Sequence, residues 1–400
     1  MDPDFKVPES EIGKRKARVQ AELQKANLGG LWIVQSADHF YFTGLFQRGM
    51  LFIPPEGEIL RFTDASSNEL PTAFAAGTST AIASMEEIPG LISDHYGRLP
   101  PNIGFEWDVI PFGLFEVFRR LLSPVECRDG SSCLLSTRAV KSAWEITQME
   151  ETGRVFQRVF SRARSDLRTG LTEMELAAMM EASAGRGNPG ASVRVRDIHT
   201  QGYPWHVLSG PHSSRLGLLD SPSSGTGTSA AFPVGAGSRK IEAREPIMVD
   251  FAYELNGYHM DVTRMFCIGE MPEKARVACE GAIEIHDAVL EKVRPGMTAD
   301  AVFRYSETVS EKLGLEASYL GPPGKKVSFI GHGIGLELIE PPFIARGKQD
   351  RLKPGMTFAL EPKMVFENQF AAGVESVFLV TETGCRLISH VPVKIFTACP

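Results

Sequence analysis

Two aspartates interrupt segments that otherwise favour β-strands. Asp250 follows the apolar run IMV at 247–249, and Asp261 comes after the turn ELNG at 254–257. If residues 256–257 form the hairpin loop, as their composition favours, residue 252 pairs with Asp261 and Asp250 lies diagonally; a loop at 255–256 pairs the two aspartates directly. Either register places both carboxylates on one face, where they need a shared proton or a cation. An exposed hairpin with two solvated aspartates is the alternative interpretation.

Three later residues extend this set of possible metal donors. His332 stands between glycines in GHGIG at 331–335, Glu361 follows the apolar run TFAL, and Glu375 precedes the apolar run SVFLV. A carboxylate in a buried strand needs a compensating partner. Four carboxylates and one imidazole suit Mn²⁺, Co²⁺ or Zn²⁺, with Fe²⁺ a further option, and do not resemble a thiolate zinc site. Taken alone, a histidine in a glycine run is more often a loop residue than a ligand.

The elements that must position these residues fall into two parts. The first third alternates β-like runs, at 31–34 and 50–53, with helical stretches such as 11–26, which is typical of a small α/β layer domain. Helical periodicity starts again at Ala143. We therefore predict an N-terminal α/β domain over residues 1–138 and a second domain over residues 139–400.

The second domain is predicted to contain most of the candidate donors. Its periodicity indicates strands at 247–253, 258–266, 356–360 and 374–380, helices at 273–293 and 299–313, and a long Gly-, Ser- and Pro-rich loop at 209–240. Long loops in compact domains are usually functional or disordered.

Composition restricts the partners and the compartment. The 400 residues are 43% hydrophobic and 23% charged, with a net charge of −7, so no excess of Lys or Arg favours nucleic acid or an anionic membrane. The first residues lack the apolar segment of a signal peptide. Six scattered cysteines form no CxxC pair, and a reducing cytoplasm is the expected location.

The order of these motifs resembles a known family. The series VD at 249–250, GYHMDVTR at 257–264, GHGIGLE at 331–337, EPP at 340–342, LEP at 360–362 and GVE at 373–375 is similar to the pita-bread metallopeptidases. YFTG at 41–44 and KS at 141–142 resemble the creatinase, prolidase and aminopeptidase P branch. The resemblance implies a creatinase-type N-terminal domain and an α+β pita-bread catalytic domain.

The same resemblance implies a dinuclear centre with two divalent metal ions, Mn²⁺ being the first expectation. Asp250 would bind one ion, Asp261 and Glu375 would bridge both, and His332 with Glu361 would complete the second. A metal-bound hydroxide would attack an amide carbonyl. Glu361 would act as general base and then general acid, and the branch implies a homodimer. Thr263 would orient Asp261.

Several positions depart from the pattern of the peptidases. Ile339 and Val234 stand at or near places where the family has histidines, and Gly373 stands where it has an arginine. The missing side chains would contact the substrate carbonyl, and one lost donor of this type costs ~10²–10³ in rate. The candidate replacements are His206 and His212 in the long loop and His259 beside Asp261, with Glu340 as a further residue near the site.

These observations support three hypotheses of different kinds. The first is a metal-dependent hydrolase resembling an Xaa-Pro peptidase, with His332, Glu361 and His259 in catalytic roles. The alternative is a non-peptidase member of the same fold, a lyase or hydrolase of a small amino-acid derivative or osmolyte. A non-catalytic binding protein is the third, although the expected loss of ligands is not seen in this sequence.

Overall fold

The computed structural model describes residues 5–46, 49–65, 76–185, 193–196, 206–217 and 221–399. The chain forms two compact units. The main segment of the N-terminal unit is Asp2–Arg138, joined by Arg196–Ile198, and the second unit comprises Ala139–Val195 and His199–Pro400.

The N-terminal unit is an α/β layer structure built on one six-stranded sheet in the order β4-β3-β2-β1-β5-β6. Trp32 in the central strand is fully buried and contacts the rings of Phe62 and Phe118, which places the apolar core around this strand. The strands are β1 (Leu31–Ile33), β2 (Met50–Ile53), β3 (Ile59–Asp64), β4 (Gly77–Ile82), β5 (Asn102–Phe105) and β6 (Glu126–Asp129). The helices are α1 (Glu9–Lys25), α2 (Ser36–Thr43), α3 (Ile88–Tyr96), α4 (Phe112–Leu121) and α5 (Ser131–Ala139), with a short 3₁₀ helix η1 (Met85–Glu87).

The second unit contains two larger sheets and a two-stranded ribbon. One sheet has the order β17-β9-β8-β7, the other has the order β11-β10-β12-β15-β16, and β13 pairs with β14. Its first strands are β7 (His206–Ser209), β8 (Ile247–Leu255), β9 (Tyr258–Ile268), β10 (Phe329–Gly333), β11 (Glu340–Ala345) and β12 (Thr357–Leu360). The remaining strands are β13 (Lys363–Phe366), β14 (Phe370–Gly373), β15 (Ser376–Val380), β16 (Cys385–Leu387) and β17 (Phe396–Ala398).

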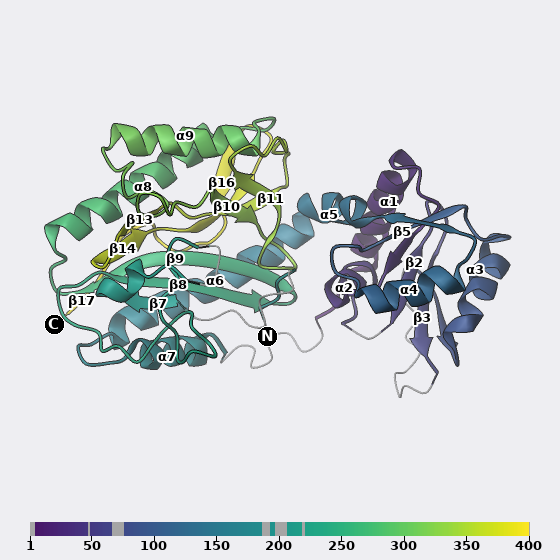
Figure 1. Cartoon of the computed structure of the whole chain (residues 1–400), viewed down its shortest axis with the longest axis horizontal. Helices are drawn as coiled ribbons and strands as arrows, with labels where there is room; N and C mark the ends of the chain where they lie inside the picture. The colour runs from purple at the N-terminus through teal and green to yellow at the C-terminus, as the bar shows by residue number, and fades with distance from the viewer. Residues whose placement is uncertain are drawn as a thin grey trace. The chain divides into compact units, whose positions relative to one another are not determined.

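Four helices cover these sheets from two sides. They are α6 (Ala143–Asp166), α7 (Glu173–Gly185), α8 (Glu273–Lys292) and α9 (Ala299–Lys312). Figure 1 shows α6 and α7 on one side of the strands and α8 and α9 on the other. The strands between the helix pairs are therefore shielded on both faces, which explains why β8, β9, β12 and β15 are buried along almost their whole length.

The start of α6 is fixed by its own sequence. The Ser142 side chain accepts a hydrogen bond from the Glu145 amide at 3.1 Å, and the Glu145 carboxylate accepts one from the Ser142 amide at 2.9 Å. This capping box satisfies two amides that a helix start leaves unpaired. Further along, Phe156 lies 4.6 Å from the ring of Phe251 in β8, so the apolar stripe of α6 packs against the sheet that carries the aspartates.

The β8–β9 hairpin follows the register that its loop composition favours. Leu255 pairs with Tyr258, so residues 256–257 form the two-residue loop, and both have positive φ (55° and 89°) as a type I′ turn requires. Ala252 is therefore opposite Asp261, while Asp250 is opposite Thr263. The two aspartates lie diagonally on one face.

The predicted long loop is only partly irregular. It begins with the end of β7 and the 3₁₀ helix η2 (Gly210–Ser214). In the described residues 215–217 and 221–240, the backbone forms isolated bridges, such as the one between Gly225 and Gly235, and no further helix or strand.

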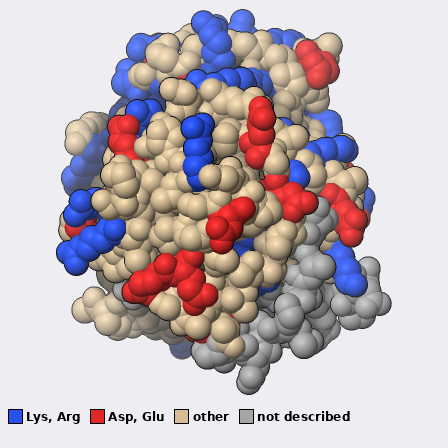
Figure 2. Space-filling model, turned by 90° about the vertical axis from the view of Figure 1, so that its right-hand side faces the viewer, with Lys and Arg blue, Asp and Glu red and all other residues tan. Residues whose placement is uncertain are grey.

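The surface carries charges of both signs. On the face that Figure 2 presents, basic and acidic side chains are interspersed with uncharged surface. Among the helices that the structure describes, none has the length and apolar character needed to span a membrane.

Candidate metal centre

Asp261, His332 and Glu375 bring one ligand atom each to a common buried point. The three atoms lie within 4.8 Å of one another. His332 Nε2 is 3.9 Å from Asp261 Oδ2 and 4.0 Å from Glu375 Oε1, too far for direct hydrogen bonds. Two atoms that bind one ion at about 2.1 Å each can lie up to ~4.2 Å apart. The two distances from His332 therefore suit a single shared cation.

Buried atoms without partners support the same conclusion. Asp261 Oδ1 and Glu375 Oε1 have no hydrogen-bond partner within the described part of the chain. Burial, reinforced by the neighbouring carboxylates, raises the pKa of both side chains well above their usual values. Such an arrangement is costly until protons or a cation neutralise it, so the donor set fits a divalent ion.

Neighbouring strands of two sheets deliver these donors. His332 lies on β10, paired with Ala359 of β12, and Glu375 immediately precedes β15, which pairs with the other side of β12. Asp261 lies on β9, and the Glu375 amide donates to the Thr263 carbonyl of that strand at 3.0 Å. The centre thus lies where the hairpin with the aspartates meets the five-stranded sheet.

Thr263 contacts a different carboxylate from the one predicted. Its hydroxyl donates to Glu375 Oε2 at 2.8 Å, and it does not orient Asp261 as the sequence analysis expected. The reason is the backbone contact between Thr263 of β9 and Glu375, which brings the Glu375 carboxylate within hydrogen-bond distance of this hydroxyl. The hydrogen bond from Thr263 therefore fixes the Glu375 carboxylate so that its other oxygen, Oε1, faces His332.

Asp250 and Glu361 are both held by Lys363, which was not among the predicted site residues. Lys363 Nζ donates to Asp250 Oδ2 at 3.1 Å and to Glu361 Oε2 at 2.8 Å, with its side chain 1% exposed. Burial alone would disfavour the ammonium, but the carboxylates outweigh it and hold the pKa of Lys363 well above its usual value. The pKa of Asp250 is lowered: burial alone would raise it, but Lys363 and His206 reverse this effect.

Two features of the sequence could have indicated Lys363. A lysine stands in the β-like run KMVF at 363–366, where a charged side chain is unusual, and it follows Glu361 by two positions, so both side chains lie on one face of an extended chain. Gly373, which stands where the family has an arginine, pairs with Lys363 in the β13–β14 ladder.

His206 is near the centre, whereas His212 is not. His206 lies opposite Asp250 in the β7–β8 pair, and its Nδ1 is 3.4 Å from Asp250 Oδ2. His212 Nδ1 is 3.2 Å from Glu173 Oε2. Glu173, at the start of α7, also accepts from the Ser209 amide at 2.7 Å and the Gly237 amide at 3.0 Å, so it fastens the long loop at both ends. This structural role of Glu173 was not predicted. The position of an acidic residue at the start of a helix was the feature of the sequence that could have indicated it.

His259 and Glu340 are used by contacts away from the donors. His259 Nε2 accepts from the Arg194 amide at 3.0 Å, and its Nδ1 is 3.1 Å from the Gly335 carbonyl. The ring therefore connects two backbone segments, and the catalytic role expected for it stays a prediction. Glu340 accepts from Lys141 Nζ at 2.7 Å in a buried ion pair.

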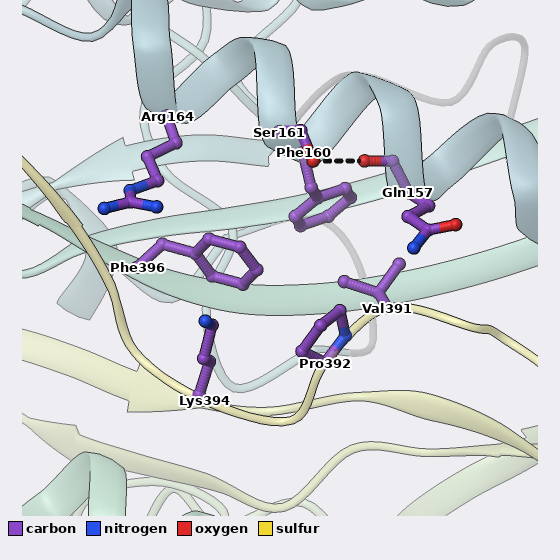
Figure 3. A pocket seen from close by; sticks show the side chains of 8 residues that line it. All are labelled: Gln157, Phe160, Ser161, Arg164, Val391, Pro392, Lys394 and Phe396. Carbon is purple, nitrogen blue, oxygen red and sulfur yellow. Dashed lines mark hydrogen bonds between the residues drawn. The ribbon is translucent and has the colours of Figure 1, made fainter.

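The substituted positions bring no imidazole or guanidinium to the centre. Val234 is buried and Ile339 is partly buried, and neither side chain can donate a hydrogen bond. Figure 3 shows a surface pocket in this unit between α6 and the segment at 391–396, lined by Phe160, Arg164 and Lys394 among others. None of the predicted site residues lines it.

The fold and the centre together define the class, a metallohydrolase of pita-bread architecture. The sequence model of metallopeptidase family M24 matches residues 147–382, more than half of the chain, and the creatinase/prolidase N-terminal domain model matches residues 15–140. The chain belongs to metallopeptidase family M24, whose members depend on metal ions and typically use two.

Known relatives match this chain over most of their length. A Mycobacterium tuberculosis protein with the name Probable dipeptidase PepE is 28% identical over 81% of this chain and 72% of its own. The Xaa-Pro dipeptidase of Pyrococcus furiosus is 21% identical over 92% of this chain and 95% of its own. The crystal structure of dipeptidase PepE from Mycobacterium ulcerans superposes with a TM-score of 0.81 at 22% identity, covering 99% of this chain and 100% of that one.

A second solved structure agrees. Xaa-Pro dipeptidase from Bacillus anthracis has a TM-score of 0.80 at 20% identity, covering 96% of this chain and 99% of that one. The predicted fold, an α/β N-terminal domain followed by an α+β pita-bread domain, is confirmed, as is the prediction of a metal-dependent hydrolase.

Proposed function

We propose that this chain is a dipeptidase that hydrolyses the bond preceding proline, with its chemistry centred on Asp261, His332 and Glu375. The observation that carries the proposal is the convergence of these three buried donors in a member of family M24. Two relatives with the name Xaa-Pro dipeptidase supply the substrate class. Residues 139–400 form the catalytic domain and residues 1–138 the creatinase-type domain in this proposal.

A bound divalent ion would supply a Lewis acid that polarises the substrate carbonyl and acidifies water. The chain itself provides the remaining functions. Glu361 accepts from Lys363 at Oε2, which leaves Oε1, 4.0 Å from His332 Nε2, as the atom that takes up and returns a proton. Thr263 holds Glu375, and His259 holds the two backbone segments beside the centre.

Mn²⁺ is the proposed ion. Carboxylate oxygens outnumber imidazole nitrogens in the donor set, and hard oxygen ligands favour Mn²⁺ over softer ions, with Co²⁺, Zn²⁺ and Fe²⁺ as the alternatives to compare. The sequence prediction of two ions was made without Lys363, which occupies one oxygen of Asp250 and one of Glu361.

A second candidate function is favoured by the substituted positions. A peptidase of this branch would place donors against the substrate at the positions of Val234, Ile339 and Gly373, and these residues have none. A small amino-acid derivative or osmolyte, cleaved by hydrolysis or elimination, would need fewer contacts of that kind. A non-catalytic binding role has no such observation in its favour.

Compartment and assembly follow as parts of the same proposal. All six cysteines are free thiols, which accords with the reducing cytoplasm. We propose a homodimer by analogy with the branch, and light scattering of the purified chain measures it directly. Neither nucleic acid nor membrane is a proposed partner.

The test is an activity screen with controlled metal content. The protein is stripped with chelator, reloaded with Mn²⁺, Co²⁺, Zn²⁺ or Fe²⁺, and assayed with Xaa-Pro dipeptides, matched Xaa-Ala dipeptides, longer Xaa-Pro peptides and small zwitterions. The proposal expects metal-dependent cleavage that is fastest for Xaa-Pro dipeptides. Asp261→Asn should abolish it, while Glu280→Gln, which removes an exposed carboxylate from α8, should not. Turnover of a zwitterion with no peptide cleavage would replace the first candidate with the second.

A further inference from the structure

Lys363 places its side-chain nitrogen inside the donor set. Its ammonium joins Asp250 Oδ2 and Glu361 Oε2, two carboxylates that the family pattern assigns to different ions. Asp250 Oδ2 also lies 3.4 Å from His206 Nδ1, so this oxygen already faces two nitrogens. An ion that Asp250 chelated through both oxygens would have to displace them.

The remaining donors form only one complete group. Over the described residues, a single set of three donors, Asp261, His332 and Glu375, has its atoms close enough to share an ion. Glu361 Oε1 lies 4.0 Å from His332 Nε2 and Asp250 Oδ1 has no hydrogen-bond partner among the described residues, but neither carboxylate belongs to a second set of this kind. The geometry therefore offers one site of three converging donors next to one ammonium.

The space for the ammonium is built into the β13–β14 ribbon. Lys363 pairs with Gly373, and a Cβ at Gly373 would lie 2.6 Å from Lys363 Cγ. Any side chain at residue 373 would thus collide with the lysine stem. The absence of a side chain at Gly373 therefore leaves the space that the Lys363 side chain occupies.

The backbone of Lys363 is also fixed. Its carbonyl accepts from the Leu320 amide at 2.8 Å, and the Val365 amide donates to the Ser318 carbonyl at 2.8 Å. The side chain is buried along its length, so withdrawing the ammonium would leave two buried carboxylates without their partner. Lys363 is therefore a structural part of the centre and not a mobile surface lysine.

From this geometry we propose that the Lys363 ammonium replaces one of the two metal ions, and that the chain operates with one divalent ion held by Asp261, His332 and Glu375. The inference rests on the proposed metal centre and concerns its stoichiometry. An ammonium supplies positive charge and hydrogen bonds but no open coordination positions. Metal binding should accordingly be a single step.

The test is the metal content of the wild type and of Lys363→Ala. Each protein is stripped, titrated calorimetrically with Mn²⁺, freed of excess ion and analysed by elemental mass spectrometry and electron paramagnetic resonance. We expect one Mn²⁺ per wild-type chain with a mononuclear spectrum. Lys363→Ala should bind two, with the spectrum of an exchange-coupled pair. Lys141→Met, which removes another buried lysine paired with a carboxylate, is the matched control and should retain one ion.

Each outcome of the metal analysis either supports or overturns the proposal of a single ion. Two ions in the wild type, or one ion in a folded Lys363→Ala, would overturn the inference while leaving the proposed function intact. No ion in any variant would overturn both. If Lys363→Ala does not fold, anomalous diffraction from wild-type crystals soaked in Mn²⁺ decides the matter: one peak among Asp261, His332 and Glu375 is expected, and a second peak beside Asp250 contradicts the proposal.

Discussion

Replacing Thr263 with valine should weaken metal binding with little change in shape. The Thr263 hydroxyl is buried and donates to Glu375 Oε2 at 2.8 Å, and this bond keeps the other oxygen turned toward His332. A hydrogen bond to a charged group is worth about 1.5–3 kcal/mol. Since about 1.4 kcal/mol corresponds to a tenfold change in Kd, Thr263→Val should bind Mn²⁺ about 10–100-fold more weakly.

Calorimetric titration with Mn²⁺ measures this change. Valine has nearly the same shape as threonine, so a large cavity does not complicate the comparison. Thr263→Ser keeps the hydroxyl and should bind within about threefold of the wild type, given the rotamer freedom that serine gains. The reasoning fails if Thr263→Val binds as tightly as the wild type, or if Thr263→Ser loses as much affinity as Thr263→Val.

Three further predictions concern stability. Burial lowers the pKa of His39 from 6.5 to about 4, so the unfolded chain binds a proton at a higher pH than the folded chain does. The free energy of unfolding should therefore fall by up to roughly 3 kcal/mol as the pH drops from 6.5 to about 4. Urea denaturation at a series of pH values should show a weaker dependence on pH for His39→Gln. Asp38→Asn removes a buried carboxylate that lies 2.6 Å from both Arg138 and Arg196, and should cost about 3–5 kcal/mol by the same assay, against less than 1 kcal/mol for an exposed ion pair. Mn²⁺ at a hundred times its Kd should stabilise the chain by about 2.7 kcal/mol, and a wild-type melting temperature that chelator leaves unchanged, or one that Mn²⁺ also raises in Asp261→Asn, would contradict the site.

The hairpin register was accessible from sequence because local chemistry determines it. Residues 256–257 are an Asn-Gly pair, which favours the two positive φ angles of a type I′ turn, and this choice puts Asp250 diagonal to Asp261. The same holds for the helix that begins at Ala143, where the capping box is written in neighbouring residues. Local signals of this kind also gave the approximate bounds of the main helices and strands.

Contacts between distant segments were less accessible. Lys363 and Asp250 are 113 positions apart, and only the folded chain shows that the ammonium reaches the carboxylate. The contacts of His259 were not accessible for a related reason: strand alternation could not show that the Arg194 and Gly335 backbones lie at its two ring nitrogens. Glu173 was missed because its partners, Ser209 and Gly237, lie far from it in sequence.

The distribution of the donors along the chain sets the earliest moment of metal loading. Asp261, His332 and Glu375 come from three separate strands or strand ends. The hydrogen bond between Glu375 and Thr263 joins the last of these donors to the β8–β9 hairpin, which carries the first. During synthesis, the ribosome must therefore have passed Glu375 before the site can exist. Loading is a late event that competes with other cellular ligands for the ion only after the surrounding strands have assembled, and fragments that end before Glu375 should be unable to recruit it.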